Sequence, residues 1–324
     1  MSGTNDQPSM PAEQPRLSVR ARAVDTAYRV LSLLPLRALH AIGTAVGTLG
    51  NWVPNSERHV ARVNIQLCFP ELALDERQAL VRASLRESAK GLLEIATLWY
   101  RPVTEVQALI RHVDGADAFH EALAEDRGLL IIAPHLGCWE ALQLWVAQHG
   151  PSHALYRPPR QGDLEALINQ GRSRSGMQFW PARPSGIRQL LAALKRGEIV
   201  GILPDQEPPE EGVFVPFFGI PARTMTLFGK FAARSGAAVI LGWAERLPRG
   251  GGFKLHFRRV EGAVGDPDEE TAATAVNHAI EAAVREAPTQ YQWSYRRFAR
   301  GPGGLRHRYK RWRKCGRWVE PTSQ

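Results

Sequence analysis

Two short, uninterrupted apolar runs constrain the fold of this chain more than any other feature. GLLIIA (Gly128–Ala133) and EIVGILP (Glu198–Pro204) lack the polar–apolar alternation of a strand with one wet face. Each therefore predicts a strand buried on both faces. Further strands are predicted at 153–157, 237–245 and 253–260, and segments with helical periodicity lie between them, at 163–176, 185–197 and 224–236. This alternation predicts the α/β class, with a mixed, largely parallel sheet covered by helices.

The segment before the first buried strand differs in character. Residues 1–20 are polar and contain proline, which predicts a disordered leader. Residues 21–55 include a weakly apolar stretch that Arg29, Arg37 and His40 interrupt and that Pro35 is expected to kink. Because a spanning helix needs about 20 apolar residues, we expect a membrane-associated helix that lies in the interface. An amphipathic helix packed on the domain is the alternative.

Two further helices are predicted, at 56–69 with Ser56 as its cap and at 75–99 with Asp75 as its cap. A last helix is predicted at 268–288. The expected organisation is a catalytic domain over 56–300, followed by a basic tail over 301–324.

Charge and cysteine content narrow the class of partner. The formal net charge of +9 favours an anionic partner: nucleic acid, an anionic membrane or a phosphorylated substrate. The tail interleaves arginines with Trp312 and Trp318, a pattern that suits a membrane interface. No RNA-binding motif accompanies the tail, so we expect no nucleic acid partner; a solubilising tail is the other interpretation. Three scattered cysteines without a C-x-x-C pair argue against a disulfide scaffold and a zinc site.

A histidine and a carboxylate stand where the first buried strand ends. His135 follows that strand, and Glu140 falls in the first turn of the next predicted helix. On one helix the two would point about 140° apart, so they can meet only if His135 lies in the loop and Gly137 relaxes the backbone. Polar groups at the carboxyl ends of strands are where α/β sheets form their sites.

This pair suits the activation of a hydroxyl. Histidine can accept a hydroxyl proton near neutral pH, and a carboxylate on its other ring nitrogen would fix the tautomer and stabilise the imidazolium. No G-x-S-x-G elbow offers a serine nucleophile. Cys138 offers a rival, a thiol nucleophile with His135 as its base.

Several blocks of sequence, in order, resemble one family. IIAPHLGCWE resembles the H-x-x-x-x-[DE] box of the lysophospholipid acyltransferase superfamily. More closely, the chain resembles the lipid A biosynthesis lauroyl- and myristoyltransferases. The blocks that agree are RVNIQLCFPEL, YRPPRQGDLEALINQGRSRSG, LLAALKRGEIVGILPDQEP, GVFVPFFGIPARTMTLFGKFAARSGAAVI and YQWSYRRFARGP. The last block departs modestly, with Ser294-Tyr295 where the family often has Leu-His.

The resemblance implies a glycerolipid acyltransferase-like fold with His135 and Glu140 as the catalytic pair. It implies an acyl-carrier-protein thioester as donor, a phosphorylated, Kdo-bearing lipid A precursor as acceptor, and the cytoplasmic face of the inner membrane as location. No metal and no organic cofactor is implied.

Other residues in these blocks have expected roles. The substrate-binding candidates are Arg157, Arg172, Asp205, Gln206 and Arg297. The arginines would bind phosphate, or else lie on a solvated face, as would Arg296. Asp205 would make a polar contact or cap a turn, and Gln206 would donate to a developing oxyanion. Phe217 and Phe218 would line an acyl channel, or else belong to the core. Thr224 would cap a helix.

Two alternatives remain open from the sequence. The same fold could acylate a lysophospholipid, an aminolipid or another glycolipid. A basic membrane-peripheral or RNA-binding protein without catalysis is the second, and it would be indifferent to substitution of His135.

Overall fold

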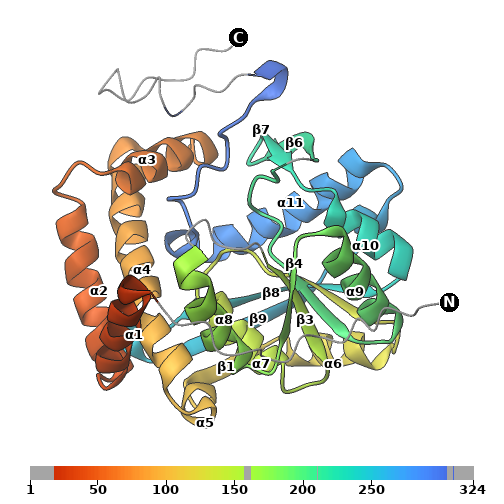
Figure 1. Cartoon of the computed structure of the whole chain (residues 1–324). Helices are drawn as coiled ribbons and strands as arrows, with labels where there is room; N and C mark the ends of the chain where they lie inside the picture. Colours follow the sequence, from red (N-terminus) through yellow and green to blue (C-terminus); the bar gives the residue numbers. More distant parts are fainter. Residues whose placement is uncertain (1–17, 157–161, 210, 305–308, 310–324) are drawn as a thin grey trace.

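The computed structural model describes residues 18–156, 162–209, 211–304 and 309 (Figure 1). Arg157, the leader as far as residue 17 and most of the 301–324 tail lie outside the described residues. Expectations for these segments therefore remain predictions.

Among the described residues, seven strands form one sheet in the order β1-β9-β8-β2-β5-β3-β4. The strands are β1 (Ile110–Asp114), β2 (Leu129–Ile132), β3 (Ser152–Tyr156), β4 (Gln178–Pro181), β5 (Ile199–Ile202), β8 (Ala238–Arg246) and β9 (Phe253–Arg259). Neighbouring strands are parallel except for β8 and β9, which pair antiparallel. The prediction of a mixed, largely parallel sheet is confirmed.

The two apolar runs became the centre of this sheet. β2 pairs with β5 from Leu129↔Ile199 to Ile132↔Ile202. Leu130 and Ile132 contribute to one hydrophobic core, while Leu129 and Ile131 contribute to a second. Successive side chains of β2 therefore enter hydrophobic cores on opposite faces of the sheet, as expected for a strand buried on both faces.

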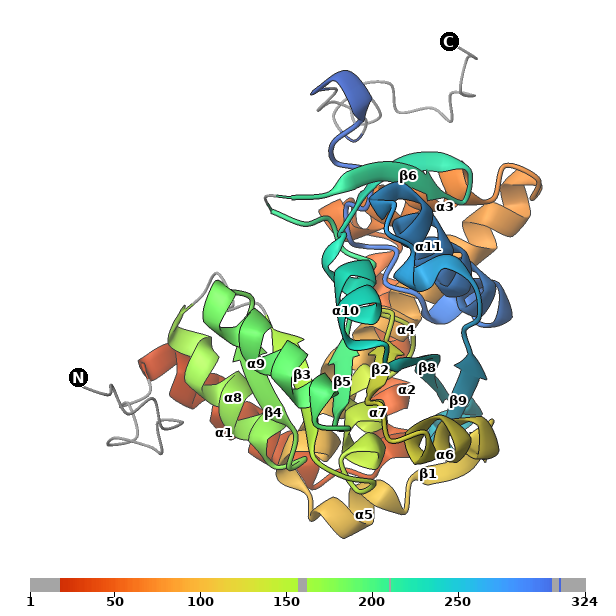
Figure 2. The ribbon, with the colours of Figure 1, turned by 90° about the vertical axis from the view of Figure 1, so that its right-hand side faces the viewer.

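Helices cover both faces of the sheet (Figure 2). The core of one face includes side chains of α9 (Pro184–Lys195), α10 (Leu227–Ser235) and α11 (Glu269–Glu286). The core of the other face includes side chains of α5 (Val103–Gln107), α6 (Ala116–Ala124) and α7 (Trp139–Val146). A separate helix, α8 (Glu165–Ser173), connects β3 to β4.

The first four helices gather along one side of the sheet (Figure 1). They are α1 (Val19–Ser32), α2 (Leu36–Gly50), α3 (Ser56–Cys68) and α4 (Leu74–Tyr100). Pro35 is the N-cap of α2, so the expected interruption separates two helices. Gly43 and Gly47 let α2 approach α4 closely, since a Cβ on either would lie within 2.8 Å of an α4 backbone atom. No helix in the described ranges has the length and apolar character that crossing a membrane requires.

Some boundaries differ from the sequence-based expectations. Asn55 rather than Ser56 caps α3, by accepting from the backbone N of Arg58 at 2.8 Å. Asp75 lies inside the first turn of α4 rather than at its cap. The predicted helix at 224–236 was too long, because a β-hairpin of β6 (Val213–Phe217) and β7 (Ile220–Thr224) precedes α10. Thr224 thus ends a strand, and the expectation that it caps a helix is wrong.

Candidate active site

The carboxyl ends of three parallel strands meet at one edge of the sheet. β2 is flanked by β5 on one side and β8 on the other, and all three run in the same direction. His135 follows β2, Asp205 follows β5, and Arg246 ends β8. The expectation that the site forms at this edge placed the first two of these residues together.

The turn between β2 and α7 requires a glycine. His135 lies in this turn, before α7 begins at Trp139, as the spacing argument required. Gly137 has φ of +62°, and a Cβ there would lie 1.9 Å from the carbonyl oxygen of Ala244. The next backbone N–H, that of Cys138, donates to the same carbonyl at 2.7 Å. The turn is therefore packed directly against β8, which leaves no room for a side chain at 137.

Asp205 is the carboxylate that holds the His135 imidazole. His135 Nδ1 lies 2.7 Å from Asp205 Oδ1, and the backbone N of His135 donates to Asp205 Oδ2 at 2.9 Å. Because an ionised carboxylate only accepts, Nδ1 carries the ring proton. Nε2 then accepts from Gln206 Nε2 at 3.1 Å, and the same amide donates to Gln292 Oε1 at 3.0 Å. Nε2 is thus the ring nitrogen without a proton, and Gln206 occupies its lone pair.

The Asp205 carboxyl stays ionised although it is 1% exposed. Burial alone would raise its pKa, but the charge that His135 carries when it is protonated and the hydrogen bonds from His135 outweigh burial and lower the pKa below its usual range. A charged carboxylate on Nδ1 stabilises the imidazolium that forms when Nε2 takes up a proton.

Glu140 has other partners. Its Oε1 accepts from Arg172 Nε at 2.9 Å, and its Oε2 accepts from Trp99 Nε1 at 3.3 Å and from the Gln143 amide. The expectation that Glu140 occupies the second ring nitrogen of His135 is therefore wrong. The physical reason is that the pairing of β2 with β5 places Asp205 beside His135. The Asp205 carboxylate therefore occupies Nδ1, the position expected for Glu140.

His135 and Glu140 nevertheless line the same cavity, of about 320 Å³. One wall is the face of α4 that carries Leu92, Ile95, Leu98 and Trp99. The C-terminal segment supplies Gln290, Tyr291, Gln292 and Ser294. Arg172 also lines the cavity, as expected for a substrate-binding candidate, while Arg246 and Glu94 lie at its buried side.

The α4 residues of this wall were not expected in the site from the sequence. Their signal was indirect: Glu94 is the one charged residue in the run GLLEIATLWY (91–100), and it is 1% exposed. Such a residue needs a buried partner.

Several candidates lie elsewhere. Phe217 and Phe218 pack in the core, where Phe218 lies 5.2 Å from Phe69 and 6.2 Å from Trp293 between ring centroids, and neither residue lines the cavity over His135. Arg297 is 2% exposed and donates to the carbonyl of Arg223 at 2.6 Å and to Thr224 Oγ1 at 2.7 Å. It too is absent from the lining of this cavity, whereas Arg296 is exposed.

Cys138 is poorly suited to act as a nucleophile. Its side chain is 2% exposed, and burial raises the pKa of its thiol well above the usual range. A thiolate is the reactive form of cysteine, so the geometry disfavours the thiol alternative.

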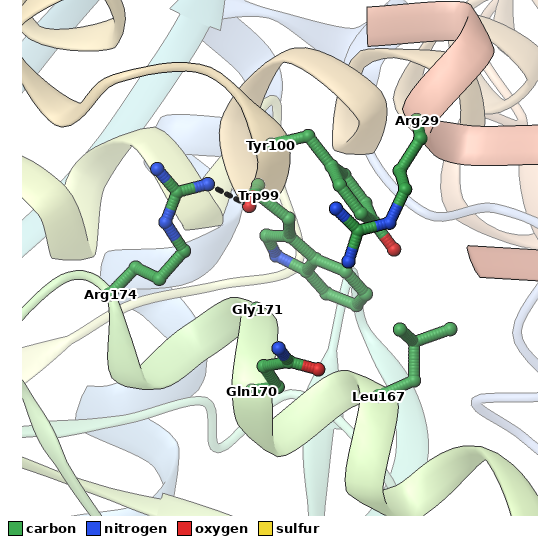
Figure 3. A pocket seen from close by; sticks show the side chains of 7 residues that line it. All are labelled: Arg29, Trp99, Tyr100, Leu167, Gln170, Gly171 and Arg174. Carbon is green, nitrogen blue, oxygen red and sulfur yellow. Dashed lines mark hydrogen bonds between the residues drawn. The ribbon is translucent and has the colours of Figure 1, made fainter. Parts of the chain in front are cut away.

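A second cavity, of about 220 Å³, is lined by residues of α1, α4 and α8 (Figure 3). Trp99 lines both cavities. Arg29 lies over the Tyr100 ring, 5.3 Å from its centroid, and Arg174 donates to the carbonyl of Trp99. Gly171 packs on the Trp99 indole, where a Cβ would approach within 2.3 Å. The indole is thus held in place by α8 where it lines both cavities.

Comparison with known families decides the class of protein. The family model described as bacterial lipid A biosynthesis acyltransferase matches residues 15–300, nearly all of the chain. The chain belongs to this family. It is an acyltransferase of lipid A biosynthesis, as the order of its sequence blocks indicated.

Individual relatives span most of the acyltransferase. The lipid A biosynthesis lauroyltransferase of Escherichia coli (strain K12) is 30% identical over 281 residues, which cover 85% of this chain and 90% of that protein. The palmitoleoyltransferase of the same strain is 30% identical over 84% of this chain and 88% of its own length. The myristoyltransferase of that strain is 24% identical over 87% of each chain.

Proposed function

We propose that this acyltransferase moves a fatty acyl group from an acyl-carrier-protein thioester to a hydroxyl of a Kdo-bearing lipid A precursor. The observation that carries the proposal is the imidazole of His135, which Asp205 holds on Nδ1 and which lines a cavity with an apolar wall along α4. Related proteins named for lauroyl, palmitoleoyl and myristoyl transfer support the lipid substrates. The net charge of +9 suits both a phosphorylated acceptor and an acidic carrier protein.

The proposed reaction runs through Nε2 of His135. This nitrogen takes the proton of the acceptor hydroxyl as the hydroxyl oxygen attacks the thioester carbonyl. The tetrahedral intermediate then collapses, the carbon–sulfur bond breaks, and the imidazolium returns the proton to the leaving thiolate. An ester and a carrier-protein thiol are formed. The Gln206 amide, 3.1 Å from Nε2, is placed to donate to the developing oxyanion once substrate displaces it.

Glu140 acts in this proposal through Arg172. The buried Glu140 carboxylate accepts from Nε of Arg172 and so fixes the orientation of the guanidinium. Glu140 does not use the two terminal nitrogens of Arg172, which can therefore bind another group. Arg172 lines the cavity with 24% of its side chain exposed, so its guanidinium can meet a phosphate of the acceptor. Arg157, which lies outside the described residues, remains a second candidate for that role.

The proposed function is tested by transfer in vitro. Purified enzyme, acylated carrier protein and a Kdo-bearing lipid A precursor are expected to yield a precursor with one additional acyl chain, detected by mass spectrometry. His135→Ala sets the background rate. Transfer to a lysophospholipid with none to the lipid A precursor would refute the acceptor assignment.

Glu140→Gln is expected to lower kcat/KM by about 10²-fold and to leave the fold intact. The amide keeps the shape but removes the charge that holds Arg172, and misplacement of a positioning group by about 1 Å costs about this much. Initial rates at varied acceptor concentration measure the effect, with Glu105→Gln, an exposed position on α5, as the matched control. A normal rate in E140Q would show that this carboxylate has no part in transfer.

We further propose that residues 21–55 dock the enzyme on the cytoplasmic face of the inner membrane, with 56–300 as the catalytic domain and 301–324 as a basic tail. Large apolar side chains in this segment face solvent; Leu33 is 79% exposed and Trp52 is 82% exposed. Leu92, which lines the cavity over His135, is itself 59% exposed. A lipid chain leaving the bilayer would therefore meet an apolar entrance.

The double variant L33E/W52E is expected to bind anionic phospholipid vesicles at least about tenfold more weakly than the wild type. Each apolar side chain buried in a bilayer contributes about 1.5–3 kcal/mol, and a carboxylate there is repelled by lipid phosphate. Vesicle flotation measures the partition. Leu74→Glu, a similar change at an exposed position of α4 outside the segment, is the control. Equal binding of the double variant and the wild type would place the membrane contact elsewhere.

A further inference from the structure

A buried ion pair lies directly beneath the turn that carries His135. Arg246, at the end of β8, donates from Nε to both carboxylate oxygens of Glu94 at 2.9 Å and from Nη2 to Oε1 at 2.7 Å. The two side chains are 5% and 2% exposed. Charges this deeply buried are costly unless each has a defined partner, so the pair has one geometry rather than a range.

The pair extends to the N-terminal helices. Glu94 Oε2 lies 3.1 Å from Nε2 of His40, a residue of α2 that is 3% exposed. Glu94 is therefore held from two sides, by β8 and by α2. This anchoring fixes the position of the carboxylate along α4 and hence the position of the guanidinium that it holds.

Arg246 also reaches the catalytic turn itself. Its Nη2 donates to the carbonyl oxygen of Gly137 at 2.9 Å. That peptide lies between His135 and Glu140, and its other neighbours are also fixed: the N–H of Gly137 donates to the Gln290 carbonyl at 3.1 Å, and the next N–H donates to Ala244. The Gln290 side chain in turn pairs with both backbone groups of Arg246, at 2.8 and 3.0 Å.

We propose that Arg246 is a positioning residue for acyl transfer: held by Glu94, its guanidinium fixes the Gly137 carbonyl and thereby the turn that presents His135 and Glu140 to one cavity. Only a planar guanidinium can donate two nitrogens to Glu94 and at the same time donate to the Gly137 carbonyl. A lysine at this position keeps the charge beside Glu94 but lacks that fork.

The inference rests on the proposed role of His135 and is tested by Arg246→Lys. We expect the kcat of the folded enzyme to fall by about 10²-fold, with KM for the acyl donor within about twofold of the wild type. The melting temperature is expected to fall as well, because the buried Gly137 carbonyl loses its partner. Arg258→Lys is the matched control, because Arg258 lies on the neighbouring strand β9, 39% exposed, and pairs with Asp114 at 2.9 Å. A merely structural role would change the melting temperature and leave the kcat of the folded enzyme unchanged.

A second variant keeps the test decisive if R246K does not fold. Glu94→Asp retains the charge but shortens the side chain, which draws the guanidinium away from Gly137, so the same selective fall in kcat is expected. His135→Ala is assayed in parallel. If H135A is inactive while R246K and E94D have full kcat, the positioning inference is overturned and the proposed function stands. If H135A itself retains full activity, the proposed function fails first.

Discussion

Asp205→Asn is expected to lower kcat by about 10³- to 10⁴-fold while the protein remains folded. The asparagine amide can donate to Nδ1, which forces the ring proton onto Nε2, the nitrogen that must accept the proton of the acceptor hydroxyl. In a Ser-His-Asp triad the equivalent change costs about 10⁴-fold in kcat. Asp205 Oδ1 lies 2.7 Å from Nδ1 and the carboxylate is 1% exposed, so solvent cannot take its place.

The measurement is the initial rate of transfer at saturating donor and acceptor, with circular dichroism as evidence of folding. Asp117→Asn, at an exposed position in the first turn of α6, is the matched control and should transfer at the normal rate. A D205N enzyme within about threefold of the wild type would mean that His135 does not act as the general base.

The fold was predictable where the hydrophobic pattern was unambiguous. Apolar runs of strand length, bounded by Gly128 and Pro204, leave few alternatives to buried central strands, and both became neighbours in the sheet. His135 was expected in a turn because only a loop with a glycine could bring it to Glu140; the turn is present, with Gly137 at positive φ, although Glu140 has other partners.

The partners within the site were not predictable to the same degree. Glu140 was favoured as the partner of His135 because it is near in sequence, whereas Asp205 is 70 residues away. Which strands become neighbours depends on the whole sheet, and local patterns carry no information on strand order. The sequence around Glu140 does not show whether its carboxylate binds an arginine or the histidine; in the structure it binds Arg172.

The sequence left the roles of buried charged and aromatic residues open for a related reason. Arg297 was expected to bind substrate, yet it is buried against Thr224 and the Phe217 ring, 5.2 Å from the ring centroid. An arginine with buried acceptors and one with a phosphate ligand look the same in a sequence. The same holds for Phe217, since core and acyl channel both require apolar side chains.

Glu94→Ala is expected to lower the free energy of unfolding by about 3–5 kcal/mol at pH 7, the usual cost of leaving one member of a buried ion pair without its partner. Arg246 would keep its charge with Glu87, 3.8 Å away, as its remaining carboxylate neighbour among the described residues, and His40 would lose the carboxylate that contacts its Nε2. Urea denaturation followed by tryptophan fluorescence measures the change. Glu105→Ala, which removes a 57% exposed carboxylate 3.9 Å from Arg101, should cost less than about 1 kcal/mol.

The difference between wild type and E94A should depend on pH in one direction. Burial alone would raise the pKa of the Glu94 carboxyl, but the Arg246 charge and the hydrogen bond from His40 lower it to about 2, against a usual value of 4.5. A carboxyl whose folded pKa is depressed contributes stability that is complete above the unfolded pKa and is lost as the pH falls through the folded one. The gap between the two proteins should therefore narrow between pH 4.5 and 2. A gap that stayed constant over this range would mean that Glu94 stabilises the protein by packing rather than by its charge.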